Sequence, residues 1–209
     1  MYVPKHFDAP EAAWCHALIA GESFALLVST GADGTPFATH LPLLLDSGRG
    51  PHGTLLGHVA RANPHARLLA AAAPTLAVFQ GPHAYVSPAW YAVHPSVPTW
   101  NYVAVHATGR PTLIEEPARV KALLDRLVTT YEARSAAPWR FESLAADYVD
   151  GMMRGIVAFE LPIERLEGKA KLSQNRGAED RAGAIRGLEA TGAPLAIATA
   201  ALMRGVREG

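Results

Sequence analysis

The chain of 209 residues is 49% hydrophobic and 18% charged, a composition that can bury one sizeable core within the size of a single domain. Its 19 Lys and Arg residues balance its 19 Asp and Glu residues, so the overall charge gives no attraction toward nucleic acid. A nucleic-acid partner would therefore need a local basic patch. We expect one domain with appendages.

The cysteine content and the apolar stretches indicate a cellular compartment. Cys15 is the single cysteine and cannot form an internal disulfide, which suits a reduced cytoplasmic thiol. Residues 1–8 lack the basic start and the apolar run of a secretory signal. No apolar stretch approaches the roughly 20 residues that a membrane helix needs, and the longest, residues 193–203, contains Pro194. We therefore expect a cytoplasmic protein without a membrane partner.

The first half of the chain predicts a short helix followed mainly by strands. Asp8 and Glu11 have the spacing of a helix N-terminus, and Asn63 before Pro64 predicts an N-cap and a first helical turn. Apolar runs bounded by Gly and Pro indicate strands. In chain order the expected elements are a helix after Asp8, a hairpin of strands 24–30 and 37–45, a strand 54–60, a helix to about residue 72, strands 75–80 and 84–87 separated by Gly81 and Pro82, and a strand 100–114.

The second half predicts helices on either side of one returning strand. From Pro117 the apolar positions fall on one helical stripe, and the same pattern recurs up to about residue 152. Residues 155–161 then alternate as a strand. From Ala178 the chain is rich in Ala, Arg and Glu, and we expect two helices separated by the Gly-Ala-Pro stretch at 192–194.

Residues 57–64 have the clearest binding chemistry. They lead a strand directly into a helix N-terminus, where the positive end of the helix dipole favours an anion. Arg61 adds a guanidinium and Asn63 adds an amide, so the segment suits a phosphate group. The alternative is that Asn63 only caps the helix and Arg61 is solvated.

Residues 81–102 concentrate aromatic and hydrogen-bonding side chains, as do sites for planar ligands. Side-chain alternation puts Trp100 and Tyr102 on one face of a strand and Asn101 on the other, so two rings can form a stacking wall. An aromatic patch of the core is the alternative.

Two further places carry polar groups that suit a ligand. Residues 171–176 form a cluster after the last strand whose donors fit a phosphate, a ribityl chain or a flavin edge, or else form a solvated loop. His40 lies on the strand face opposite Leu41 and Leu43, so it faces solvent, a ligand or a partner subunit.

These segments, taken together, resemble the motifs of the PaiB family of flavin-binding transcriptional regulators, in the family's order. The resemblance runs from Tyr2 into the tail, and its specificity comes from the combination of motifs. The family is similar to split barrels of the pyridoxamine-phosphate-oxidase type, which implies a homodimer with FMN in each of two clefts between the subunits. The matching stretches are Tyr2-Val3-Pro4 with Phe7, Thr39 to Pro42, Gly57 to Pro64, Gly81 to Tyr85, Val97 to Tyr102, and Lys171 to Arg176.

The resemblance also implies a fold and a set of ligand contacts. The expected fold is mainly β with helices (α+β): an FMN-binding split β-barrel domain over residues 1–175, with a helical insertion at about 117–152 and a helical C-terminal extension over 176–209. The strand around His40 and the segment 57–64 would bracket the FMN phosphate and ribityl chain, with the aromatic segment beside the ring. The candidate FMN-binding residues are His40, Leu41, Pro42, His58, Val59, Arg61, Asn63, Trp100, Asn101, Lys171, Gln174 and Asn175. We expect no metal site, because no metal-ligand spacing occurs.

Three functions remain open. The sequence does not decide whether the chain is an enzyme, and it identifies neither a substrate nor a DNA operator. The resemblance implies a negative transcriptional regulator, and DNA is a partner through the resemblance only. The tail favours burial over base reading, because the helix from Pro194 begins with Leu195 and Ile197. An FMN-dependent oxidoreductase acting on a small molecule with NAD(P)H is the alternative, since the flavin itself supplies the chemistry. A haem-binding split barrel is a third interpretation, with His58, His83, His94 or His106 as axial ligand.

Overall fold

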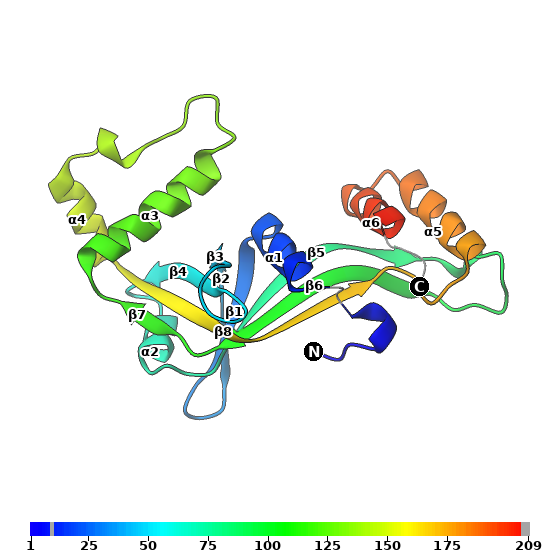
Figure 1. The fold of residues 1–209 in the computed structure, drawn as a ribbon, viewed down its shortest axis with the longest axis horizontal. Helices are drawn as coiled ribbons and strands as arrows, with labels where there is room; N and C mark the ends of the chain where they lie inside the picture. Colours follow the sequence, from blue (N-terminus) through cyan, green and yellow to red (C-terminus); the bar gives the residue numbers. More distant parts are fainter. Residues whose placement is uncertain (9–10, 206–209) are drawn as a thin grey trace. The chain divides into compact units, whose positions relative to one another are not determined.

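The structure, a computed structural model, describes residues 1–8 and 11–205 and consists of an antiparallel sheet with several helices (Figure 1). The strands are β1 (Phe24–Thr30), β2 (Pro36–Pro42), β3 (Leu44–Asp46), β4 (Thr54–Ala60), β5 (Thr75–Val86), β6 (Thr99–Gly109), β7 (Thr112–Ile114) and β8 (Ile156–Lys171). The α-helices are α1 (Ala12–Gly21), α2 (His65–Ala70), α3 (Pro117–Glu132), α4 (Ala146–Arg154), α5 (Ala178–Ala190) and α6 (Pro194–Gly205). Short 3-10 helices are η1 (Lys5–Phe7), η2 (Pro88–Trp90) and η3 (Phe141–Ser143).

The chain forms two compact units, each assembled from segments that are distant in sequence. The first unit comprises Met1–Glu22, Phe79–His106 and Glu167–Gly209, and the second comprises Ser23–Val78 and Ala107–Leu166. The strand order is β2-β1-β5-β6-β8-β4-β3, and β7 pairs with β8. Among the described residues, no helix has both the length and the apolar character needed to cross a membrane.

The second unit contains the expected hairpin and the expected long helix. Strands β1 and β2 pair antiparallel from Phe24 opposite Pro42 to Thr30 opposite Pro36. Helix α3 begins at Pro117 and buries one stripe, as its apolar spacing predicts. The stripe consists of Val120, Leu123 and Leu127, which pack with Leu44, Leu56, Ile114 and Ala158.

The first unit is built around the helical hairpin of α5 and α6, which lie side by side (Figure 1). Trp90 of η2 contacts α5 so closely that a Cβ on Gly187 would come within 2.2 Å of the indole, and only glycine fits there. Asp180, 3% exposed, accepts hydrogen bonds from the backbone N–H groups of Ala92 (2.8 Å) and Val93 (3.0 Å). The C-terminal helices thus fix the loop between β5 and β6.

The expected break at Gly81 and Pro82 is wrong, because β5 continues from Thr75 to Val86. Glycine serves here for close approach: a Cβ on Gly81 would lie 2.6 Å from the Val103 side chain and 2.9 Å from that of Leu18. The long strand predicted for residues 100–114 is instead divided into β6 and β7, with Arg110 and Pro111 between them.

Other predicted boundaries also differ. Strand β8 continues past residue 161 to Lys171, and Ile163 is buried between the exposed Pro162 and Glu164. The second helix of the insertion begins only at Ala146, after η3. The burial expected for Leu195 and Ile197 is wrong, since they are 50% and 45% exposed. Helix α6 instead buries three small residues, Ala196, Thr199 and Ala200, together with Met203.

Candidate functional site

The residues predicted to bind FMN fall into two groups, one in each unit. His40, Leu41, Pro42, His58, Val59, Arg61 and Asn63 belong to the second unit, and Trp100, Asn101, Lys171, Gln174 and Asn175 belong to the first. Each group is described by itself below.

In the second unit, Arg61 is held by backbone carbonyl groups. Its Nε donates to the carbonyl oxygen of Arg154 (2.7 Å) and its Nη2 to that of Ile156 (2.8 Å), while its backbone N–H donates to Gly155 (2.8 Å). The side chain is exposed, and Nη1 makes no hydrogen bond to another described residue. Arg61 therefore fastens the start of β8 and still presents N–H donors to solvent.

The N-cap residue of α2 is Pro64 and not Asn63 as the sequence predicted, but the Asn63 side chain still bonds to the first turn of the helix. Its Oδ1 accepts a hydrogen bond from the backbone N–H of His65 (2.9 Å), and its Nδ2 lies 3.4 Å from the Thr39 hydroxyl. The helix is only the six residues His65–Ala70, shorter than the sequence predicted. The helix dipole argument for a phosphate is correspondingly weak.

His65, which the sequence did not single out, is fully buried and hydrogen-bonded at both ring nitrogens. Its Nδ1 lies 2.9 Å from the Thr39 hydroxyl and its Nε2 lies 2.8 Å from the Ser29 hydroxyl. Ser29 in turn lies 2.6 Å from the Thr75 hydroxyl, which donates to the carbonyl oxygen of Ala73. The only sequence signal was a histidine in the first turn of a helix.

The direction of these hydrogen bonds fixes the tautomer of His65. Because the Thr75 hydroxyl uses its proton on a carbonyl, it must accept from Ser29, and Ser29 must then accept from His65. The proton of a neutral imidazole is therefore on Nε2, and Nδ1 accepts from Thr39. Burial lowers the pKa of His65, which keeps this neutral form.

His58 lies on β4 opposite Ala158 of β8 and is half-buried. Its Nδ1 is buried and has no hydrogen-bond partner within the described protein. Burial also lowers the pKa of His58, so the ring is neutral near pH 7. A buried nitrogen without a partner is costly in the folded protein, so His58 Nδ1 calls for a hydrogen-bond partner from outside the chain.

The strand residues beside these groups differ in exposure. Leu41 and Val59 are each 4% exposed, so their side chains are core and only their backbone could touch a ligand. His40 is exposed and stacks on Phe24, with ring centroids 6.1 Å apart. Pro42 ends β2 and is half-buried.

In the first unit, Trp100 heads an exposed aromatic group. It is 52% exposed, and its ring centroid lies 6.2 Å from that of Tyr85 and 6.3 Å from that of His83. Lys171 donates to the Trp100 carbonyl oxygen (2.8 Å) and to the Thr99 hydroxyl. Burial, with a smaller effect of Lys169, lowers the pKa of Lys171. The aromatic group provides ring faces on which a planar ligand can stack.

The remaining predicted residues of the first unit have structural contacts. Asn101 is fully buried and donates to the Ser173 hydroxyl (2.9 Å). Gln174 closes the turn after β8, because its side chain accepts from the N–H of Leu172 (2.7 Å) and donates to the carbonyl oxygen of Ala170 (2.5 Å). Asn175 is exposed. Asn101 and Gln174 therefore already use much of their hydrogen-bonding capacity.

Arg61 also borders a cavity of about 540 Å³ in the second unit. Much of the lining is apolar, and the charged residues Glu115, Asp150 and Arg154 stand beside it. A volume of this size suits a small organic molecule. The apolar lining consists of Leu113, Ile114, Pro117, Val120, Met153, Ile156, Val157 and Ala158.

A family model described as "Putative FMN-binding domain" matches residues 1–165. The "Protease synthase and sporulation protein PAI 2" of Bacillus subtilis (strain 168) is 36% identical over 203 residues, which cover 97% of this chain and 96% of that protein. An uncharacterized protein of Aspergillus fumigatus is 32% identical, over 74% of this chain and 77% of that protein.

Solved structures share the fold at low sequence identity. The "FAD and Heme binding protein" from Mycobacterium smegmatis has a TM-score of 0.61 at 20% identity, covering 85% of this chain and 79% of that one. A flavocytochrome from Azotobacter vinelandii also has a TM-score of 0.61, at 16% identity, covering 87% of this chain and 78% of that one. The α+β split-barrel fold expected from the sequence is confirmed.

Proposed function

Because this chain belongs to the FMN-binding domain family and has FMN as its cofactor, we propose that it is a homodimeric, flavin-binding regulator of transcription. The observation that carries this proposal is the 36% identity, along 97% of the chain, to a protein named for protease synthesis and sporulation. Bound FMN supplies reversible redox chemistry, and the protein supplies binding and orientation.

His58 and Arg61 provide complementary chemistry for the cofactor. Neutral His58 offers an unpartnered, buried Nδ1, which fits an uncharged polar group such as a ribityl hydroxyl or a ring amide. Arg61 keeps exposed N–H donors on a guanidinium that carbonyl groups hold in place, which fits the phosphate. Asn63 and His40 add polar side chains to the same unit. The donors present therefore fit FMN.

Arg61→Ala tests the phosphate assignment. The variant is expected to weaken FMN binding about tenfold to a hundredfold and riboflavin binding much less, since riboflavin lacks the phosphate that a charge-assisted hydrogen bond would hold. Both ligands are titrated by flavin fluorescence against wild type and variant. Equal losses for the two ligands would assign Arg61 to the fold alone, through its bonds to Arg154 and Ile156.

Exposed aromatic side chains on the strands support the proposed homodimer. Strand β2 ends the strand order and carries the exposed His40, which stacks on Phe24, itself 67% exposed. Trp100 and Tyr85 are also about half exposed. A second copy would cover such surface. Light scattering is expected to give twice the chain mass of 22.2 kDa, and a monomer with full FMN occupancy would refute the dimer.

An FMN-dependent oxidoreductase is the second candidate function, because the cavity beside Arg61 has room for a small substrate. Two measurements separate the candidates. A regulator predicts that transcript levels change when the chain is deleted. Wild type is expected to restore them, whereas His58→Phe, once flavin absorbance shows that it has lost FMN, is expected not to. An oxidoreductase predicts sustained NADH or NADPH oxidation by the purified flavoprotein with a small acceptor. Turnover without any transcript change would reverse our order of preference.

A further inference from the structure

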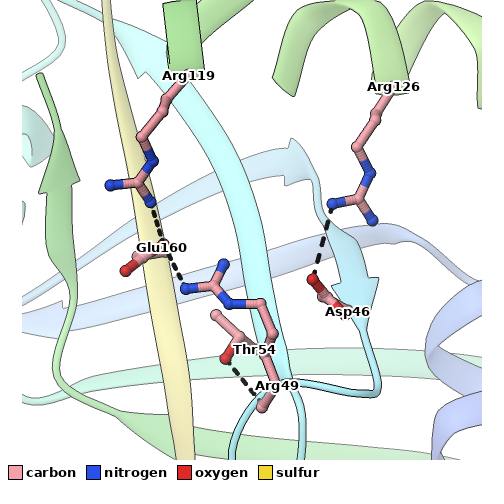
Figure 2. Close-up of polar contacts among 6 residues, drawn as sticks. All are labelled: Asp46, Arg49, Thr54, Arg119, Arg126 and Glu160. Atoms are coloured by element: carbon pink, nitrogen blue, oxygen red, sulfur yellow. Dashed lines mark hydrogen bonds and ion pairs between the residues drawn. The ribbon is translucent and has the colours of Figure 1, made fainter. Parts of the chain in front are cut away.

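Three arginines and two carboxylates gather in the second unit (Figure 2). Glu160 of β8 accepts with one oxygen, Oε2, from both Arg49 and Arg119, each at 2.9 Å. Arg126 of α3 points toward Asp46 at 3.9 Å (Figure 2). We call these three arginines, with the surface between them, the arginine cluster.

The two carboxylates do not neutralise the charge of the arginine cluster or use all of its N–H donors. Three guanidiniums face two carboxylates, so one positive charge is uncompensated. The 3.9 Å separation between Arg126 and Asp46 is too long for a hydrogen bond, and Arg126 makes no other polar contact with a described residue. The three arginine side chains are 44–50% exposed, so they can reach a ligand from solvent.

The start of α3 adds to this positive potential. Arg119 lies in the first turn of the helix, where the helix dipole disfavours a cation. That turn contains no acidic residue, and the side chain of the N-cap residue Glu116 makes no capping hydrogen bond. An anion near Arg119 would therefore gain from both the guanidinium and the helix terminus.

The cluster borders a small, open hollow on the surface. The three arginines, with Leu56, Ile114, Ala122 and Leu123, line a cavity of about 150 Å³. Arg119, Ala122, Leu123 and Arg126 have the spacing of one helix face, and the small Ala122 leaves the space between the two arginines open. Several guanidinium groups around a small hollow can each donate N–H hydrogen bonds to the oxygens of one phosphate group.

A purely structural purpose explains the cluster poorly. Helix α3 is already packed on the sheet by the buried side chains of Val120, Leu123 and Leu127. Exposed ion pairs add only about 0–1 kcal/mol each. Arg126, without a hydrogen bond, adds less than a pair with good geometry.

We propose that Arg49, Arg119 and Arg126 form a second anion site, which binds the phosphate group of a ligand other than FMN. The site is independent of the proposed function, since none of its residues belongs to the candidate FMN contacts. The same chemistry could meet a free phosphate ester or the backbone phosphate of a nucleic acid, and the experiment separates these sources.

The test uses the full chain saturated with FMN, titrated with inorganic phosphate by calorimetry at low ionic strength. We expect saturable binding, weakened about tenfold to a hundredfold by Arg126→Gln, the factor that corresponds to losing one charge-assisted contact. The matched control Arg134→Gln removes an exposed arginine just after α3 and should leave the affinity unchanged.

A steric variant keeps every charge. Ala122→Leu is expected to fill the cavity and abolish phosphate binding, whereas Ala118→Leu, on the same helix and exposed but outside the lining, should not. Thermal unfolding of all variants checks that they fold. Absence of saturable binding at about millimolar phosphate, equal losses in the control variants, or displacement of phosphate by FMN would each overturn the proposal.

Duplex DNA identifies the source of the phosphate. DNA affinity that falls with Arg126→Gln, and with added phosphate, assigns the site to a nucleic-acid backbone. Phosphate binding that depends on Arg126 while DNA affinity does not assigns it to a free phosphate ester. Both results support the phosphate chemistry, and neither depends on whether the FMN protein is a regulator.

Discussion

The buried His65 makes a sharp prediction about the pH dependence of stability. Its ring is fully buried, and its two nitrogens are committed to Thr39 and Ser29 in a chain of hydrogen bonds whose direction requires a proton on Nε2 alone. Burial lowers the pKa of His65 in the folded state, and it does the same for His58. The unfolded chain has the ordinary histidine pKa near 6.5.

The sign follows from proton binding. Below about pH 6.5 the unfolded chain binds protons on these histidines that the folded chain does not, so the free energy of unfolding falls as the pH falls. The contribution is complete above the unfolded pKa and is lost progressively toward the folded pKa. Each histidine gives a slope of at most about 1.4 kcal/mol per pH unit, and His58 and His65 together at most about 2.7.

His65→Gln removes one of the two groups whose pKa burial lowers, and is expected to reduce the slope. Glutamine can still hydrogen-bond one of the two hydroxyls, so the variant should lose about 1–3 kcal/mol at neutral pH through the unpaired partner. Urea unfolding, followed by tryptophan fluorescence at several pH values between about 5.5 and 7.5, measures both quantities.

The matched control is His94→Gln, which replaces an exposed histidine and should leave the slope unchanged. The reasoning is refuted if wild-type stability is constant over this range, or if His65→Gln has the slope of wild type. A slope lost equally in His94→Gln would show that the effect is not one of burial.

The remaining predictions concern the C-terminal helices of the first unit. Asp180→Ala should lose about 3 kcal/mol, because two backbone N–H groups lose a charged acceptor, and the melting temperature should fall by roughly 6–12 °C in calorimetry. Gly187→Ala should lose about 1–3 kcal/mol and shift the fluorescence of the displaced Trp90, whereas Gly21→Ala, with open space at its Cβ, should be close to neutral. Met203→Ala should lose about 2–5 kcal/mol through the cavity that it leaves, measured by urea unfolding; a smaller loss would mean that α6 contributes little to the core.

The spacing of apolar residues predicted correctly those helices and strands for which it fits only one kind of secondary structure. The β1–β2 hairpin and helix α3 agree with the sequence because alternation and a helical stripe each admit one interpretation. The family and its cofactor were also predictable, from motifs in a fixed order. Strand β5 was not, because Gly81 is an ordinary strand breaker unless one knows that Val103 lies against it.

The contacts of the candidate sites could not be predicted, because they join distant parts of the chain. Arg61 bonds to carbonyl groups 93 and 95 residues away, and Arg49 reaches Glu160 across 111 residues. The buried hydrogen bonds of His65 gave no signal in the sequence, since its partners come from β1 and β2. A sequence shows which polar side chains are present, and the fold decides which of them already have hydrogen-bond partners within the protein.

The two groups of arginines in the second unit illustrate this difference. In the arginine cluster, Glu160 neutralises part of the charge of Arg49 and Arg119 while it orients them. Arg61 is oriented by carbonyl groups alone, and no ion pair within the described residues involves it. Its guanidinium is therefore held in place without an ion-pair partner among the described residues. Since a carbonyl anchor orients an arginine without competing for its charge, the bonds to Arg154 and Ile156 favour the phosphate role of Arg61 over a purely structural one.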